Sequence, residues 1–231
     1  MFSRLIKFSL LFFLSISFSA CVSSPGSSSK ALVFASIYPV YDAVKNLAGE
    51  DFQVEIFIPP QAEVHHFEPS LAQIQKLQQS SALFFVNPHL ENWTGQLNFK
   101  NLYPLNSENL TNPHLWLDFP AWSQALNQIS EKLIQIKPEA KLKIEQNLKN
   151  YQAQLNSLHQ SYQNSLQNCQ NYQINWAGHE AFRNWEKNYH LEFRSLQEIS
   201  PDSEILPQNL AQLLNNLKQN PTLFYEEIDP R

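Results

Sequence analysis

Short apolar runs alternate with amphipathic stretches in the first part of the chain. The pattern predicts, in order, strand 32–37, helix 41–48, strand 52–58, helix 70–79 and strand 82–86. The first helix ends at Gly49, the second strand stops at Pro59, and Leu71, Ile74 and Leu77 share one face of the second helix. This β-α-β-α-β succession is typical of a parallel sheet covered by helices.

From Pro138 the apolar positions change to spacings of three and four residues. They are Ile144, Leu148, Tyr151, Leu155, Leu158, Tyr162 and Leu166. No Pro or Gly interrupts them, which predicts one helix of about 30 residues and about 45 Å at 1.5 Å per residue. A helix of this length between two α/β stretches is better explained as a rigid connector than as a sheet-covering helix.

Beyond this helix the alternation resumes. It predicts strand 172–177, helix 180–189, strand 193–197, helix 207–219 and strand 222–226. Three strands are few for an independent lobe, so the second lobe is expected to be incomplete. The predicted fold is α/β, with two lobes of mainly parallel sheets joined by one long rigid helix. The expected domains are a signal peptide (1–20), a lipidated Cys and tether (21–30), an N-terminal lobe (31–120), a helical connector that includes the long linking helix (121–168) and a partial C-terminal lobe (169–231).

The N-terminus has the layout of a secretory signal peptide. Arg4 and Lys7 precede an apolar run at 8–18 that is too short to span a bilayer, and Cys21 follows small residues at the cleavage point. This is the bacterial lipobox arrangement, although Phe18 replaces the usual aliphatic residue. We therefore expect Cys21 to carry the lipid that anchors the protein to the cell membrane, on its periplasmic or extracellular face. The alternative is ordinary cleavage that leaves Cys21 as an accidental thiol.

Charge and cysteine content narrow the classes of partner. The chain has 16 Lys and Arg against 21 Asp and Glu, and two of the basic residues lie in the predicted signal peptide. The resulting excess of acidic residues argues against nucleic acid as a partner and favours cations. After Cys21 only Cys169 remains, so no intrachain disulfide is expected.

Three of the seven histidines lie in loops, two of them after predicted strands. His65 follows the second predicted strand, His114 lies in a polar loop that contains Pro113, and His179 directly follows the strand at 172–177. Ligands of open parallel sheets bind beyond the carboxyl ends of the strands, and three imidazoles with one oxygen suit zinc. By position alone the signal is weak, because a loop histidine is more often a solvated surface residue.

Longer segments resemble a known family. They are ASIYPVYDAVKNLAGEDFQVEIFIPPQAEVHHFEPSLAQIQKLQQSSALFFVNPHLENW, NPHLWLD, GHEAFRNWEKNYHLEF and ISPDSEILPQNLAQLLNNLKQNPTLFYEE. In this order they resemble the ZnuA/TroA-like zinc and manganese solute-binding proteins of ABC transporters, from about Leu32 to Glu227. The resemblance implies two α/β lobes joined by a long helix, as the periodicity independently predicts.

The resemblance also implies a metal site. His65, His114 and His179 match three family ligands, and a His at the third position favours zinc, with manganese as the alternative. The fourth family ligand, an aspartate, would lie some fifty residues beyond Phe224, so the chain is expected to be truncated and to carry three of four ligands. The candidates to complete the site are Glu204, Glu226, Asp229 or a water molecule.

Other side chains near these motifs receive weaker assignments. His66 and His89 are expected near the site rather than on it, and His159 and His190 on helix surfaces. Glu68, Trp116 and Glu180 either orient the imidazoles or serve as helix caps and core packing.

The predicted function is capture of a divalent transition metal and its delivery to an ABC permease. The receptor is expected to be non-enzymatic and monomeric. One alternative is a surface adhesin or a degenerate remnant. A zinc hydrolase is a further alternative, because three histidines with an open position also describe catalytic zinc, but the chain has no HExxH motif.

Overall fold

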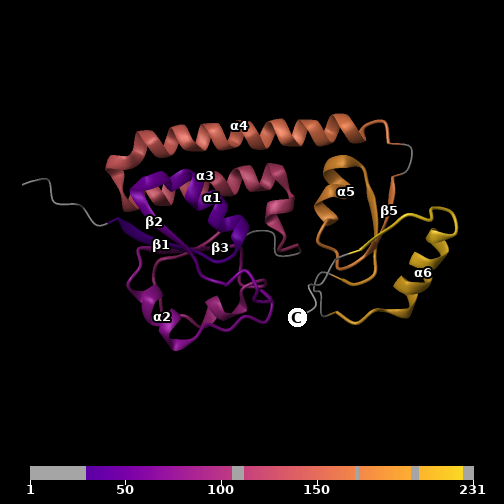
Figure 1. Cartoon of the computed structure of the whole chain (residues 1–231), viewed down its shortest axis with the longest axis horizontal. Helices are drawn as coiled ribbons and strands as arrows, with labels where there is room; N and C mark the ends of the chain where they lie inside the picture. Colours follow the sequence, from indigo (N-terminus) through magenta and orange to yellow (C-terminus); the bar gives the residue numbers. More distant parts are fainter. Residues whose placement is uncertain (1–29, 106–111, 170–171, 199–202, 226–231) are drawn as a thin grey trace, which may run out of the picture.

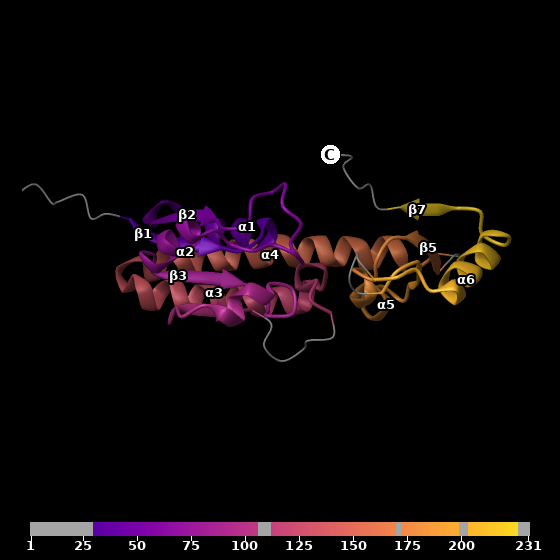
Figure 2. The same ribbon diagram turned by 90° about the horizontal axis from the view of Figure 1, so that it is seen from below.

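The computed structural model describes residues 30–105, 112–169, 172–198 and 203–225 (Figure 1). The predicted signal peptide, Cys21 and the tether lie outside these residues. Within the described part, two parallel sheets lie along one long helix, as Figures 1 and 2 show from two directions. In the same part of the chain, no helix is long and apolar enough to cross a membrane.

The first sheet has strand order β2-β1-β3-β4, and every strand pair in it is parallel. Its elements are β1 (Ala31–Ala35), α1 (Tyr38–Ala48), the 3-10 helix η1 (Gly49–Asp51), β2 (Phe52–Ile56), α2 (Leu71–Gln78), β3 (Ala82–Phe85), η2 (Asn92–Gln96) and β4 (Leu102–Pro104). The three predicted strands are confirmed. The sequence prediction missed β4, which has three residues and ends in Pro104. An edge strand tolerates this proline because no further strand needs its missing N–H.

The two helices of this half show how local sequence sets their ends. Pro39 stands in the first turn of α1, where its missing N–H costs nothing, so the helix begins earlier than predicted. It ends at Gly49, whose φ of 57° lies in the left-handed region that favours glycine. Ser70 caps α2 in a reciprocal pair with Gln73. The expected apolar face of α2 is only partly right, because Leu77 is buried but Leu71 is 80% exposed.

The connecting region contains η3 (Leu115–Leu117), α3 (Phe119–Ile136), η4 (Pro138–Ala140) and α4 (Lys141–Leu166). Helices α1 and α3 lie between the first sheet and α4, whereas α2 lies on the opposite face of the sheet (Figure 1). The 26 residues of α4 give a length of about 39 Å at 1.5 Å per residue. The single long helix is therefore confirmed, and it passes both sheets.

The buried stripe of α4 departs from the prediction at one point. Ile144 and Leu155 are buried, but Leu158 is 47% exposed. The next inward position is His159, whose Nδ1 lies 2.8 Å from the Tyr189 hydroxyl. The stripe thus runs from 155 to 159 by a step of four instead of three. The expectation that His159 is a surface residue is only partly right, because His159 is half-buried.

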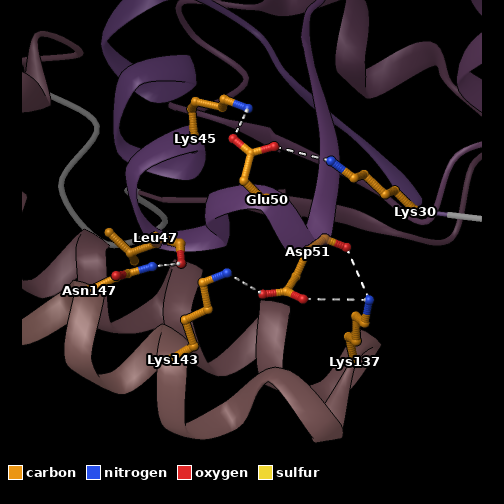
Figure 3. Close-up of polar contacts among 8 residues, drawn as sticks. All are labelled: Lys30, Lys45, Leu47, Glu50, Asp51, Lys137, Lys143 and Asn147. Atoms are coloured by element: carbon orange, nitrogen blue, oxygen red, sulfur yellow. Dashed lines mark hydrogen bonds and ion pairs between the residues drawn. The ribbon is translucent and has the colours of Figure 1, made fainter. Parts of the chain in front are cut away.

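Polar contacts fix the start of α4 to the loop that follows α1 (Figure 3). Lys143 and Lys137 both pair with Asp51, at 3.0 and 3.9 Å. Asn147 donates to the Leu47 carbonyl at 3.0 Å. Each exposed ion pair contributes little, so the apolar packing of α4 on α1 and α3 carries most of the stabilisation and the polar contacts set the register.

The second sheet has strand order β6-β5-β7, again with parallel pairs. Its elements are β5 (Gln173–Ala177), α5 (Arg183–Tyr189), β6 (Glu192–Ser195), α6 (Pro207–Leu217) and β7 (Leu223–Tyr225). All five predicted elements are present. Helix α5 begins three residues later than predicted, because 178–182 form a turn that carries His179.

A buried carboxylate ties the strand ends of the first sheet together. Glu91 is fully buried and accepts hydrogen bonds from the Ser36 hydroxyl (2.6 Å), the Val86 N–H (3.1 Å) and the Asn87 N–H (3.0 Å). Ser36 follows β1, and Val86 and Asn87 follow β3. Burial outweighs these hydrogen bonds and raises the pKa of Glu91 from 4.5 to about 7. One side chain therefore holds two loops at the carboxyl edge of the sheet.

This network predicts a pH-dependent stability. A raised pKa means that the folded protein binds the Glu91 proton more tightly than the unfolded chain does. The stabilisation that protonated Glu91 contributes to the folded state is therefore fully present below pH 4.5 and is lost as pH rises through about 7. The free energy of unfolding falls by about 3 kcal/mol in all. Glu91→Gln cannot titrate. We expect the free energy of unfolding of the wild type, measured by urea denaturation, to fall relative to that of E91Q as pH rises from about 5 to about 8. A difference that is constant with pH would contradict the assignment.

Candidate metal centre

A cavity of about 680 Å³ lies between the two halves, at the carboxyl ends of both sheets. In its wall, residues 37–39 follow β1, residues 58–60 and 62–65 follow β2, Leu90 follows β3, and residues 179, 181 and 182 follow β5. Much of the wall is apolar. The side chains in it that carry oxygen atoms or imidazole nitrogens are Tyr38, Glu63, His65, His114, His179 and Tyr225. The cavity thus collects all three predicted histidine ligands.

His65 lies in the loop after β2 and is half-buried. The loop is held by a turn in which the Ala62 N–H donates to the Pro59 carbonyl, at 2.9 Å. Just beyond His65, the ring of Phe67 packs against Trp93, with centroids 5.8 Å apart. The turn on one side and the aromatic contact on the other place the His65 ring in the cavity wall.

His114 is buried, with 4% of its surface exposed. Its backbone N–H and its Nδ1 both lie within hydrogen-bonding distance of Asn112 Oδ1, at 3.0 and 2.8 Å. Trp116 packs edge-on against the imidazole with ring centroids 5.4 Å apart. Trp116 therefore packs against a predicted ligand and lines the cavity itself.

His179 follows β5 and is 8% exposed. Its carbonyl accepts hydrogen bonds from Trp176 Nε1 (2.9 Å) and from the Ala181 N–H (2.7 Å). The next residue, Glu180, donates its N–H to the Glu198 carbonyl at 3.0 Å. These bonds fold the turn between β5 and α5 so that the imidazole faces the first half of the molecule.

The three rings approach one another closely. His179 Nε2 lies 3.1 Å from His114 Nε2, and the centroids of these rings are 4.9 Å apart. Two imidazoles on one tetrahedral zinc at 2.0–2.1 Å would have nitrogens about 3.3 Å and centroids about 5.2 Å apart. The pair therefore already has nearly the required spacing.

The ring of His65 stands further back. Its centroid lies 6.3 Å from that of His114 and 6.4 Å from that of His179. Both distances exceed the tetrahedral value by about 1 Å. In agreement, no three His, Cys, Asp or Glu side chains of the described residues form a closed metal-holding group. A movement of about 1 Å by His65 would close the triangle.

The electrostatics of the cavity keep His114 neutral. Burial, followed by the neighbouring His179 and His65, lowers the pKa of His114 from 6.5 to about 3. A neutral imidazole has a lone pair to donate to a metal ion, whereas an imidazolium has none. Burial thus prepares this residue for metal binding and not for positive charge.

Among the described residues, the other candidates do not line this cavity. His66, His89 and His190 are exposed and do not line it. Glu204, proposed as a fourth ligand, is also exposed and absent from the wall, and Glu226 and Asp229 lie outside the described residues. Glu68 is exposed and does not cap α2, whereas Glu180 pairs with Arg183 in the turn before α5.

Sequence reasoning missed Glu63. Among the described residues it is the carboxylate in the cavity wall. Its Oε2 accepts a hydrogen bond from the His66 N–H at 3.0 Å, which holds it in the same loop as His65. Its position two residues before a predicted ligand was the available signal.

Helix α5 also contacts the first half directly. Trp185 Nε1 donates to the Leu117 carbonyl (2.9 Å), and Asn188 Nδ2 donates to Asp118 Oδ1 (3.2 Å). The Trp185 ring packs against Tyr162 of α4 with centroids 4.9 Å apart. These contacts, together with α4, fix the separation between His179 and His114.

Comparison with known proteins identifies the family. The family model described as "Zinc-uptake complex component A periplasmic" matches residues 33–230. The chain belongs to this family. The prediction of a zinc and manganese solute-binding family, rather than an enzyme family, is therefore confirmed.

Individual relatives are distant. The chain is 24% identical over 238 residues to the zinc-binding lipoprotein AdcA of Streptococcus pneumoniae, covering 90% of this chain and 47% of AdcA. It is also 24% identical to the high-affinity zinc uptake protein ZnuA of Bacillus subtilis, covering 89% of this chain and 74% of ZnuA. The chain thus spans about half the length of AdcA.

Solved structures confirm the fold. The laminin-binding protein Lmb of Streptococcus agalactiae superposes with a TM-score of 0.80 at 21% identity, covering 88% of this chain and 83% of Lmb. The Zn(II)-bound ZnuA-like domain of S. pneumoniae AdcA gives a TM-score of 0.74 at 26% identity, covering 88% of this chain and 81% of that domain. The predicted α/β class with its long helix is confirmed.

The contact between the halves can be tested with Trp185→Phe. The variant removes the N–H that reaches the Leu117 carbonyl and should lower the free energy of unfolding by about 1 kcal/mol more than its matched control. That control is Trp93→Phe, because the buried Nε1 of Trp93 has no hydrogen-bond partner within the described residues. Urea denaturation of both variants gives the comparison. Equal losses would show that the Trp185 hydrogen bond contributes nothing.

Proposed function

We propose that this chain captures a divalent transition metal as its substrate in the cavity between its halves, and delivers it to an ABC permease. The observation that carries the proposal is the convergence of His65, His114 and His179, from loops of both halves, on one partly apolar cavity. The family matched by residues 33–230 is named for zinc uptake, which supports the same function. Because the site consists of metal ligands and the family is one of transport proteins, we infer that the chain binds and releases the metal without catalysing a reaction.

Zinc is the metal that this site suits best. Neutral imidazoles are borderline ligands that suit zinc, whereas manganese prefers a larger share of oxygen ligands. Relatives of both kinds are similar to the chain: AdcA is a zinc-binding lipoprotein, and PsaA of Streptococcus anginosus, 26% identical over 253 residues, is named for manganese. The donor set, and not overall similarity, is therefore our reason for preferring zinc.

Binding would rearrange the site only slightly. The metal would replace the direct contact between the Nε2 atoms of His114 and His179, and His65 would advance by about 1 Å. The fourth position would be taken by the Glu63 carboxylate or by a water molecule. The apolar part of the wall would strengthen every charge interaction inside the cavity by keeping bulk water away.

The remaining parts of the proposal concern placement. We infer that Cys21 carries a lipid that anchors the protein to the membrane on its periplasmic or extracellular face, and that it acts as a monomer. Several relatives, including AdcA and FimA of Streptococcus parasanguinis, are lipoproteins, which supports the anchor. Lmb is described as both adhesin and metal transporter, but at 21% identity the likeness concerns fold alone, so we do not propose adhesion.

Histidine variants test the site directly. His65→Ala, His114→Ala and His179→Ala each remove one of three nitrogen ligands and should weaken zinc binding by at least about a hundredfold, because removal also leaves the metal with an incomplete set of ligands. Isothermal titration of the metal-free protein with zinc measures the effect.

The matched control for these variants is His89→Ala. His89 is exposed and does not line the cavity, so the His89→Ala variant should bind zinc with the affinity of the wild type. Retention of one tightly bound zinc by the double variant H65A/H179A would overturn the proposed site.

Glu63→Gln tests the carboxylate. The variant keeps the size of the side chain and an oxygen that can accept from the His66 N–H, but removes the negative charge from the cavity wall. We expect zinc affinity to fall by about tenfold, because a nearby full charge in a partly dry site contributes at least about 1.4 kcal/mol. The control is Glu68→Gln, an exposed carboxylate outside the wall. Equal affinities of E63Q and E68Q would exclude Glu63 as a contributor.

A further inference from the structure

We propose that Asn112 is the positioning residue of the metal site: it holds the His114 imidazole in the one tautomer whose lone pair faces the cavity, and it links this ligand to the second half of the molecule. The inference rests on the proposed metal-binding function and deepens it. Asn112 is buried, with 3% of its surface exposed, and lies two residues before His114. Asn112 contacts the ligand His114 and would not touch the metal itself.

The orientation of the Asn112 amide follows from its backbone contact. The atom of Asn112 that faces His114 lies 3.0 Å from the His114 backbone N–H, which can only donate. That atom must therefore be the carbonyl oxygen Oδ1 and not the amide nitrogen. The contact at 3.4 Å between Asn112 Nδ2 and the Ala181 carbonyl agrees, because a carbonyl can only accept.

The tautomer of His114 follows from that orientation. Oδ1 has no proton, and it lies 2.8 Å from His114 Nδ1, so Nδ1 must carry the proton and donate it. In the neutral ring, Nε2 then has the free lone pair. Nε2 is the atom that faces His179 across the cavity, at 3.1 Å. Asn112 therefore aims the lone pair of His114 at the place where the metal would bind.

A consequence reaches His179. Because His114 Nε2 accepts, a hydrogen bond across the 3.1 Å gap in the metal-free protein requires a proton on His179 Nε2. A metal that binds both nitrogens has to displace this proton from His179 alone. The two imidazoles therefore enter the site unequally, with His114 ready to bind and His179 changing its tautomer.

The second arm of Asn112 crosses between the halves. Its Nδ2 reaches the carbonyl of Ala181, which is two residues after His179 and whose own N–H donates to the His179 carbonyl at 2.7 Å. One amide thus contacts the segment of each of the two closest ligands. A rotation of the second half that moved His179 would also pull on the side chain that fixes His114.

Two variants separate these roles. Asn112→Asp keeps an oxygen that can accept from both His114 N–H groups but cannot donate to Ala181, whereas Asn112→Ala removes both functions. The ring ¹⁵N chemical shifts of His114, measured by NMR in the metal-free protein at neutral pH, report which nitrogen carries the proton. Isothermal titration with zinc alone measures affinity. Asn147→Ala is the control for stability, because it loses the hydrogen bond from the Asn147 amide on α4 to the Leu47 carbonyl, and neither residue lines the cavity.

We expect the wild type and N112D to show a proton on Nδ1 of His114, and N112A to lose this preference. Zinc affinity should fall about 10- to 100-fold in N112A, the usual effect of losing a residue that orients a ligand, and recover to within about threefold of the wild type in N112D. N147A should bind zinc as the wild type does.

Three results would overturn the inference: a proton on Nε2 of His114 in the wild type, an unchanged tautomer in N112A, or no recovery in N112D. The wild-type spectrum decides even if N112A fails to fold. If the wild type does not bind zinc, the proposed function is refuted. The tautomer measurement is made without metal, so it tests the role of Asn112 independently of zinc binding.

Discussion

The packing of α4 against helices of both halves is the constraint on which the candidate site depends. Near its start the helix rests on α1 and α3, and near its end it packs against α5. The separation of the two halves is therefore set by one helix, with Trp185 and Asn188 adding hydrogen bonds directly to the first half. Without this fixed separation, the carboxyl ends of the two sheets would not face one another, and His179 would have no defined distance from His114.

Within that frame, polar side chains fix the loops that carry the chemistry. Buried Glu91 holds the loops after β1 and β3, and buried Asn112 holds His114. Both are costly to bury unless their hydrogen bonds are made. Glu91 accepts from two backbone N–H groups and the Ser36 hydroxyl. Asn112 contacts the backbone N–H and the ring of His114 and the Ala181 carbonyl. The ligand pair that results is close to the spacing of a tetrahedral metal, and only His65 has to move. Such a site orders few groups on binding, which favours tight capture.

Much of the fold and the three histidines could be predicted from the sequence, for identifiable reasons. The spacing of apolar residues located the strands and the long helix, because buried positions recur with the period of each element. The three histidines could be located because the motifs around His65, His114 and His179 are distinctive. Periodicity could not decide between Leu158 and His159, because neighbouring positions at the edge of a helical stripe differ little in direction. The strand β4 was missed because it is short and ends in proline. Partners such as Asn112 and Ala181, or Ser36 and Glu91, are far apart in the chain, and no local pattern links them.

The central claim is that three imidazoles from both halves hold one metal ion. Zinc K-edge X-ray absorption on the protein loaded with one equivalent of zinc tests it most directly, because multiple scattering from imidazole rings counts them. The account predicts three imidazole nitrogens at about 2.0 Å and one oxygen ligand, as in a tetrahedral site. Two or fewer imidazoles, or a sulfur ligand at about 2.3 Å, would contradict it.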